Sequence, residues 1–409
     1  MSNTPNIRFS GYTDPWKQRK FSDFTWNAGK RNKDDLDLEP YAITNEHGFI
    51  RQTEAHDDFG YMKDTDRKAY NIVMPNSFAY NPARINVGSI GYYEGTENVI
   101  VSSLYEVFQT ADYVDDRFLW HWFKSDEFPK WIGRLQEGSV RLYFYYDKLC
   151  ECQMLMPSVP EQKRIAEILD GIDDLITLHQ RKCDETKTLK KYMLKKMFPQ
   201  NGALVPEIRF AGFNDPWKQR KLGEVLSFIK DGTHGTHPDT DEGPLLLSAK
   251  NIKNGRITWD DADRRISQDE YKKIHSTFIL KSNDVLMTIV GSIGEAAILK
   301  NPEGITFQRS VAFLRPNEEI TSEFLYSEIL TSRFQKDLDS RKSTSAQPGI
   351  YLGDLSEIPF SFPGDLNEQE KIGSLLLKLD ETITLHQRKC DELKEVKKYM
   401  LQNMFPQKG

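Results

Sequence analysis

The chain has 409 residues, a net charge of −6 and 38% hydrophobic residues, which allows two or three domains with cores of their own. It lacks an apolar run of 18 residues, which argues against a membrane span, and its start does not have the pattern of a secretory signal. We therefore expect a cytoplasmic protein. The acidic net charge speaks weakly against nucleic-acid binding, although a local basic surface can override it.

The four cysteines, at 150, 152, 183 and 390, are too few and too irregularly spaced for a disulfide framework, and we interpret them as reduced thiols. Cys150 and Cys152 resemble half of a metal site, but no second Cys or His pair lies nearby at ligand spacing. The stretch HGTHPDTD (234–241) also contains metal-binding residue types, yet its Gly, Thr and Pro content favours an ordinary loop. We expect no metal.

Two segments of mixed strands and helices are expected, in the same order. In the first, residues 85–95 and 98–109 are strand-like and residues 117–132 are helical. In the second, residues 243–249, 276–290 and 305–316 are strand-like, and residues 322–338 form an amphipathic helix. The letters of the two segments differ although their order of features is alike.

The ends of these segments, in contrast, are repeated closely. EQKRIAEILDGIDDLITLHQRKCDETKTLKKYMLKKMFPQ, from Glu161, matches a stretch from Glu368 at about 25 of 40 positions, and the decapeptide ITLHQRKCDE is identical in both. A second match joins IRFSGYTDPWKQRKFSDF at Ile7 to IRFAGFNDPWKQRKLGEV at Ile208. The chain is therefore a tandem repeat with conserved ends and divergent interiors.

Both 40-residue matches predict long helices. Apolar or small residues recur in steps of four and three, which is the 3.5-residue period of a coiled-coil seam. The predicted seam residues are Ile165, Leu169, Ile172, Ile176, His179 and Cys183 in the first helix, and Ile372, Leu376, Leu379, Ile383, His386 and Cys390 in the second. We interpret the His and Cys residues as packing residues rather than as ligands.

The expected fold is α+β: two globular mixed α/β domains separated by a two-helix antiparallel coiled coil, with a pseudo-two-fold internal repeat. The antiparallel direction follows because the termini of a compact domain usually lie close together. Residues 1 and 409 should then also be neighbours. The expected boundaries are 1–157 for the first domain, 158–200 for the central helix, 201–364 for the second domain and 365–409 for the C-terminal helix.

The sequence contains no recognisable catalytic set. It has no phosphate loop, no dinucleotide-binding glycine motif and no Asn-Pro-Pro-aromatic stretch of an amino-methyltransferase; Asn81-Pro82-Ala83-Arg84 is only a superficial likeness. Polar stretches near turn glycines suit the reading of base edges and phosphates, since Arg favours guanine and Asn or Gln favours adenine. Ordinary polar loops remain the alternative for any single residue. The occurrence of GSIG in both interiors, at 88–91 and 291–294, favours the functional reading slightly.

The candidate DNA-binding residues come from these stretches. In the first domain they are Asn81, Arg84, Ser89, Ser103 and Arg141. In the second they are Lys250, Asn251, Ser292, Gln308, Arg309, Ser345 and Gln347.

Two divergent domains, each opened by an RFxGFxDPWKQRKLGEV-like stretch and closed by P-x-x-EQ-x-KI before a long helix, resemble the specificity subunit of type I restriction-modification systems. The resemblance covers essentially the whole chain; Phe21-Ser22-Asp23 and Lys163 are small departures. It implies two target recognition domains that each read one half of a split, asymmetric DNA site. It also implies that the helices set the spacing and dock two modification subunits, which carry S-adenosylmethionine. Two restriction subunits would add ATP-dependent cleavage, and this chain itself would have no catalytic residues and no cofactor.

If two identical partners dock, the same surface must occur twice. The residues expected to face outward on the repeated decapeptide are Gln180, Arg181, Asp184 and Glu185, with their copies Gln387, Arg388, Asp391 and Glu392. Two other readings stay open. A structural protein whose coil joins two receptor-like domains would show no dependence on DNA, and an enzyme would show activity as a purified chain.

Overall fold

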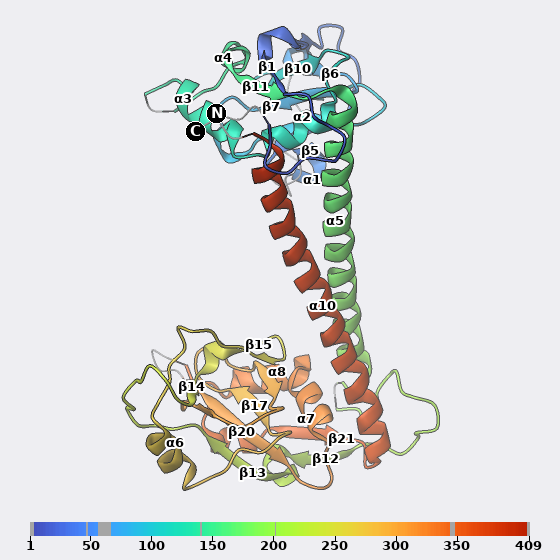
Figure 1. Cartoon of the computed structure of the whole chain (residues 1–409). Helices are drawn as coiled ribbons and strands as arrows, with labels where there is room; N and C mark the ends of the chain where they lie inside the picture. Colours follow the sequence, from blue (N-terminus) through green and yellow to red (C-terminus); the bar gives the residue numbers. More distant parts are fainter. Residues whose placement is uncertain are drawn as a thin grey trace. The chain divides into compact units, whose positions relative to one another are not determined.

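The computed structural model describes residues 4–45, 48–55, 67–139, 141–200, 202–343 and 348–406 (Figure 1). The chain forms two compact units. One consists of Met1–Leu178 and Lys389–Gly409, and the other of His179–Arg388. Each unit contains a globular α+β domain and a pair of helical segments.

The described strands of the first unit form three sheets. β1 (Lys17–Lys20) pairs with β11 (Gln153–Met156). An antiparallel sheet has the order β2 (Thr25–Asn27), β10 (Glu106–Thr110), β7 (Ser77–Tyr80), β8 (Ile90–Tyr93). A mixed sheet has the order β3 (Lys30–Arg31), β6 (Asn71–Val73), β9 (Val99–Val101), β4 (Pro40–Thr44), β5 (Gly48–Arg51). The short helices are α1 (Gln52–Ala55), α2 (Asp116–Phe123), α3 (Glu127–Leu135) and α4 (Tyr146–Glu151).

The second unit repeats most of this plan. β12 (Lys218–Lys221) pairs with β21 (Pro359–Phe362), and an antiparallel sheet has the order β13 (Leu226–Asp231), β20 (Val311–Pro316), β17 (Val285–Thr288), β18 (Ala296–Ile298). β14 (Leu245–Leu247) pairs in parallel with β19 (Ile305–Phe307), and β15 (Ile252–Lys253) with β16 (Arg256–Ile257). The helices are α6 (Gln268–His275), α7 (Ser322–Ile329), α8 (Ser332–Ser340) and α9 (Leu352–Ser356).

The two four-stranded sheets have the same topology and register. The last residue of β7, Tyr80, pairs with the first residue of β10 and with the first residue of β8. The last residue of β17, Thr288, likewise pairs with Val311, the first residue of β20, and its N–H donates to the carbonyl of Glu295 just before β18. The prediction of α+β domains with a common order of elements is therefore confirmed.

The predicted single helices at 117–132 and 322–338 are wrong in detail, because each is two helices. α7 ends at Ile329, and the Thr331 side chain accepts a hydrogen bond from the N–H of Phe334 to cap α8. In the first domain the hydroxyl of Ser125 accepts from the N–H of Glu127, where α3 begins. The hydroxyl that caps α8 competes with continuation of α7, and the spacing of hydrophobic residues does not reveal this competition.

The repeated letters at the domain ends make the same contact twice. The guanidinium of Arg8 donates two hydrogen bonds, of 2.7 and 2.8 Å, to the carboxylate of Glu161. Arg209 and Glu368 form the same pair at the same distances. Both glutamates are buried, so each needs the paired charge, and this fixes the conserved opening stretch of each domain to the start of its long helix.

The glutamine that follows each of these glutamates is also used twice. Gln162 accepts a hydrogen bond of 2.8 Å from the N–H of Asp115, and Gln369 accepts one of 2.9 Å from the N–H of Thr321. These two donors belong to the N-cap residues of α2 and α7. The repeated stretch at the start of each long helix therefore connects that helix to an equivalent helix of its domain, α2 in the first and α7 in the second.

The long helices are α5 (Val159–Lys196) and α10 (Leu366–Met404), as the 3.5-residue period predicts (Figure 1). Within the second unit they run antiparallel, since Cys183 contacts Gln387 whereas Lys190 contacts Asp380. Within the first unit, Lys397 bonds to Asp173. The N–H of Ile7 donates to the carbonyl of Asn403 at 2.9 Å, so the first and last described segments do meet.

The predicted seam residues divide into two groups by their surroundings. The outer ones are buried in a domain core: Ile165 and Leu169 share a cluster with Met404, and Ile372 and Leu376 share one with Met197. Ile172, Cys183 and Cys390 are also buried, whereas Leu379, Ile176, Ile383, His179 and His386 are half-buried.

All four cysteines are free thiols. Within the described ranges, no helix is long and apolar enough to cross a bilayer.

Candidate DNA interface

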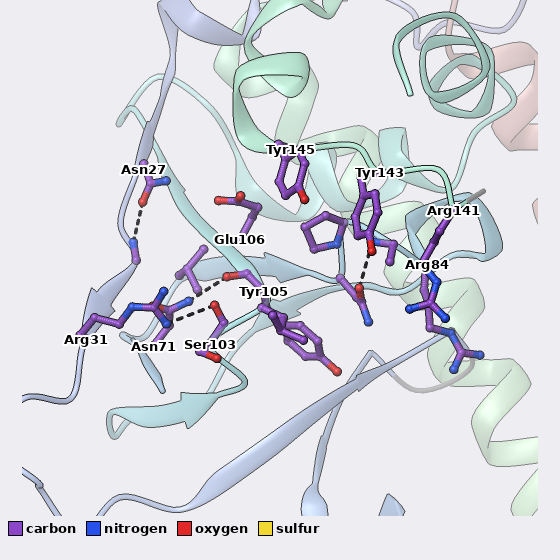
Figure 2. A pocket seen from close by; sticks show the side chains of 16 residues that line it. Asn27, Arg31, Asn71, Arg84, Ser103, Tyr105, Glu106, Arg141, Tyr143 and Tyr145 are labelled. Carbon is purple, nitrogen blue, oxygen red and sulfur yellow. Dashed lines mark hydrogen bonds between the residues drawn. The ribbon is translucent and has the colours of Figure 1, made fainter. Parts of the chain in front are cut away.

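A cavity of about 860 Å³ opens where several loops of the first domain meet (Figure 2). Its walls come from the ends of β2 and β7, the turn between β9 and β10, and the segment before α4. The polar and aromatic residues that line it are Asn27, Arg31, Asn71, Asn81, Arg84, Ser103, Tyr105, Glu106, Arg141, Tyr143 and Tyr145.

The charge of this cavity is positive. Three arginines, Arg31, Arg84 and Arg141, face one acidic residue, Glu106. Burial raises the pKa of the Glu106 carboxyl, and the nearby Arg31 opposes this rise. An excess of guanidinium groups beside amides favours a ligand with anionic and hydrogen-bonding groups, such as a nucleic acid.

The loop after β7 places two predicted residues on one wall. The side-chain oxygen of Asn81 accepts from the N–H of Ala83 at 3.0 Å, which closes a tight turn and leaves Arg84 exposed. Burial raises the pKa of Tyr105, and the nearby Arg84 and Asn81 partly oppose this rise. Asn81, Arg84 and Tyr105 are therefore close neighbours, with the guanidinium on the open side.

The opposite wall contains two residues that sequence reasoning missed. The Nη1 of Arg31 donates to the carbonyl of Ser103 at 3.1 Å, and Nδ2 of Asn71 donates to the carbonyl of Tyr105 at 2.8 Å (Figure 2). Both bonds hold the turn between β9 and β10. Arg31 and Asn71 thus act on the shape of the cavity, and no feature of the sequence linked residues 31 and 71 to a turn at 103.

The stacked pair of Tyr143 and Tyr145 was also missed. Their ring centroids lie 5.5 Å apart and the rings are almost parallel, at 3°. The intervening Phe144 is buried in the core, so the two tyrosines project to the same side of an extended segment. The Y-F-Y alternation in LYFYY is the signal that could have found them.

Four of the five predicted residues of the first domain line this cavity: Asn81, Arg84, Ser103 and Arg141. Ser89 does not, and its selection was wrong: it is buried, and its hydroxyl donates to the carbonyl of Ile43 at 2.9 Å. The two GSIG stretches both lie at the connection between matching strands, β7 to β8 and β17 to β18, but Gly91 lies in β8 whereas residues 291–294 all precede β18.

In the second domain, the loops after β13 and β19 meet. Arg309 is exposed, and its N–H donates to the carbonyl of Thr233 at 3.0 Å. The hydroxyl of Thr233 lies 2.7 Å from Nε2 of His237, whose Nδ1 lies 2.9 Å from a carboxylate oxygen of Glu270. This chain of side chains fixes the loop that supports Arg309.

The other predictions for the second domain are mixed. Half-buried Gln308 and exposed Ser292 lie in loops after β19 and β17. The choice of Asn251 was wrong, since it is buried and its amide bonds to Ser248 and Thr258. Lys250 bonds to Asp263 at 2.6 Å, which lowers the pKa of that carboxyl to about 2. The remaining candidates, Ser345 and Gln347, lie outside the described residues.

The charged residues of the repeated decapeptide are exposed, as the docking hypothesis requires. Arg181, Asp184, Glu185, Arg388, Asp391 and Glu392 are exposed on the two helices. Gln180 and Gln387 were also expected to face outward, but both are half-buried. The side-chain oxygen of Gln387 lies 3.8 Å from the sulfur of Cys183.

The predicted loop at 234–241 does not form a metal cluster in the structure. Among the described residues there is no group of three or more His, Cys, Asp or Glu side chains placed to hold a metal ion. His234 instead bonds to Asp231 at 2.6 Å.

The repeated fold and the arginine-lined cavity define a tandem-domain protein suited to binding nucleic acid. Comparison with known proteins agrees. The family model described as "Type I restriction modification DNA specificity domain" matches twice, at residues 15–188 and 214–395. The chain therefore belongs to the type I restriction-modification DNA specificity family, and it is a specificity subunit that recognises DNA sequence.

Individual relatives are distant. The chain is 24% identical to the type I restriction enzyme MjaVIII specificity subunit of Methanocaldococcus jannaschii over 77% of this chain and 75% of that protein. It is 20% identical to the putative MjaX specificity subunit of the same organism, over 95% and 92%. The crystal structure of a type I restriction-modification S subunit from M. genitalium matches its fold with a TM-score of 0.64, at 15% identity over 99% of this chain and all of the other.

Proposed function

We propose that each domain reads one half of a bipartite, asymmetric DNA site. The target recognition domains would be residues 1–157 and 201–364, and residues 158–200 and 365–409 would be the spacer helices. The observation that carries the proposal is that the two domains share the topology of their four-stranded sheet while the loops at the ends of its matching strands differ in chemistry. Two domains that read different DNA sequences can share a scaffold, but their DNA-facing loops must differ.

In the first domain, Arg84, Asn81, Ser103 and Arg141 are the proposed readers. Arg84 and Arg141 supply planar donors for guanine edges or for phosphates, and Asn81 and Ser103 supply shorter polar groups. In the second domain we propose Arg309, Gln308 and Ser292. Lys250 is less suited to contact DNA because its ammonium group already forms an ion pair with Asp263.

The repeated helices are proposed to dock two identical modification subunits. Exposed copies of the same charged residues, such as Arg181 with Arg388 and Asp184 with Asp391, offer one surface twice. The modification subunits would supply S-adenosylmethionine and methylate adenine. Two restriction subunits would add ATP-dependent translocation and cleavage, and this chain would contribute no catalytic group. We place its action in the cytoplasm, where the modification subunits would meet their DNA substrate.

The test is methylation mapping in a host that expresses this chain with its modification partner. We expect methylated adenine to appear in one split motif, with two specified segments around an unspecified spacer. Expression of the modification subunit without this chain is the control and should give no such motif. A continuous motif, or methylation that does not depend on this chain, would contradict the proposal.

A further inference from the structure

One side chain in the cavity of the first domain does not fit a surface that only binds polar groups. Leu104 is 76% exposed, and of the described residues that line the cavity it is the one exposed aliphatic side chain. Pro82 and Val107, which also line it, are buried. Its neighbours on the walls are arginines and amides.

The turn that carries Leu104 is held in place. The N–H of Tyr105 donates to the carbonyl of Ser102 at 3.0 Å, and the N–H of Leu104 lies 3.3 Å from the hydroxyl oxygen of Ser102. The bonds from Arg31 and Asn71 to the carbonyls on either side of Leu104 fasten the same turn to β3 and β6. The turn therefore presents Leu104 outward in a fixed position.

A platform for an unstacked base lines the same cavity. The parallel rings of Tyr143 and Tyr145 form one wall, and Tyr145 is 49% exposed (Figure 2). Aromatic faces stack on nucleobases whatever the base. Arg84 and Arg141 lie among the cavity residues as donors for base edges or for phosphates.

We propose that Leu104 is a wedge that enters the base stack of the half-site bound by the first domain, and that the Tyr143–Tyr145 pair receives the base it displaces. Apolar side chains act in this way where proteins unstack a base step and kink the duplex. This inference rests on the proposed function. It adds that the first domain also reads how easily its site is deformed, because the cost of unstacking depends on the base step.

The test uses the full chain with its modification partner and duplexes that carry 2-aminopurine, one position at a time, through the half-site of the first domain. Its fluorescence rises when the base leaves the stack. Apart from the adenine that the modification subunit itself extrudes for methylation, we expect a rise of several-fold at one step with the wild type. The rise should be lost with Leu104→Ala and retained with Leu104→Met. The matched control is Leu36→Ala, which alters an exposed leucine of the same domain outside the cavity and should leave the rise unchanged.

Three results would overturn the wedge while leaving the proposed function intact. They are specific binding without a fluorescence rise at any position other than the methylated adenine, a rise at another step that persists with Leu104→Ala, and loss of affinity on replacing a thymine by uracil without such a rise. The last result would assign Leu104 to a thymine methyl group in an intact groove. Absence of any sequence preference in binding would instead overturn the proposed function, and the wedge with it.

Discussion

The imidazole rings of His179 and His386 meet with their Nδ1 atoms 2.9 Å apart. They occupy the same position of the two identical decapeptides, so the internal two-fold relation of the sequence places a residue against its own copy. A hydrogen bond between two Nδ1 atoms requires that one carries a proton and the other a lone pair. A proton added to the accepting Nδ1 would remove this bond and set two N–H donors, one of them on a charged imidazolium, against each other.

This pair predicts a loss of stability in acid. Burial, together with His179 and Lys182, lowers the pKa of His386 below its ordinary value. The folded protein then binds this proton less readily than the unfolded chain, so stability is lost as pH falls below about 6.5. We expect the Tm followed by circular dichroism to fall between pH 7.5 and 5.5, and His386→Asn to reduce that fall by a few degrees. His234→Asn, at an exposed histidine, is the control, and equal pH dependence of all three proteins would refute the assignment.

A second contact that occurs in both copies of the repeat predicts a loss of stability in each unit. Nζ of Lys190 lies 2.6 and 2.7 Å from the carboxylate oxygens of Asp380, and Nζ of Lys397 lies 2.5 and 2.6 Å from those of Asp173. These side chains are mostly buried, so neutralising the acid leaves an ammonium group poorly compensated. Asp380→Asn and Asp173→Asn should each lower the free energy of unfolding by about 1–3 kcal/mol in urea titrations. The exposed Asp184→Asn should change it by less than about 0.5 kcal/mol, and a similarly small effect of Asp380→Asn would count against the contact.

The arginine assignments predict losses confined to single base positions. Arg84→Ala should weaken binding by about 1–3 kcal/mol and relax discrimination at one position of one half-site, and Arg309→Ala should do so in the other half. Competition binding with singly substituted duplexes measures this. Arg164→Ala, at an exposed arginine of α5 outside the cavity, should leave the pattern unchanged. A loss that is uniform across sequences, with a smaller salt dependence, would mark a phosphate contact instead.

The spacer role predicts a change in the DNA site when the helices are lengthened. One helical turn, about 5.4 Å long, is added to each helix. The insertion lies within His179–Asp184 of α5 and within the matching His386–Asp391 of α10. If the helices set the spacing, the unspecified gap should grow by about one or two base pairs, at 3.4 Å each. The specified bases should stay the same. Methylation mapping measures both, and an unchanged gap in an active complex would argue against the spacer role.

The sequence predicted the repeated frame well because that frame is made of local periodicity and of letters that occur twice. Arg84 and Asn81 were selected as polar residues near turn glycines, and the structure places both at the wall of the cavity. Ser89 looked equally suitable in the sequence, but in the structure it is buried and its hydroxyl donates to the carbonyl of Ile43, 46 positions away. Arg31 and Asn71 were missed for the same reason: their roles arise from contacts with a turn far along the chain, which the letters alone do not show.

The most direct test of the central claim is an exchange of one domain interior. Residues 226–364 are replaced by the corresponding segment of another specificity subunit, and the methylated motif of the complex is mapped by long-read sequencing. If each domain reads its own half-site, one half of the split motif changes and the other half is retained. A motif that changes in both halves, or in neither, would contradict the assignment of one half-site to each domain.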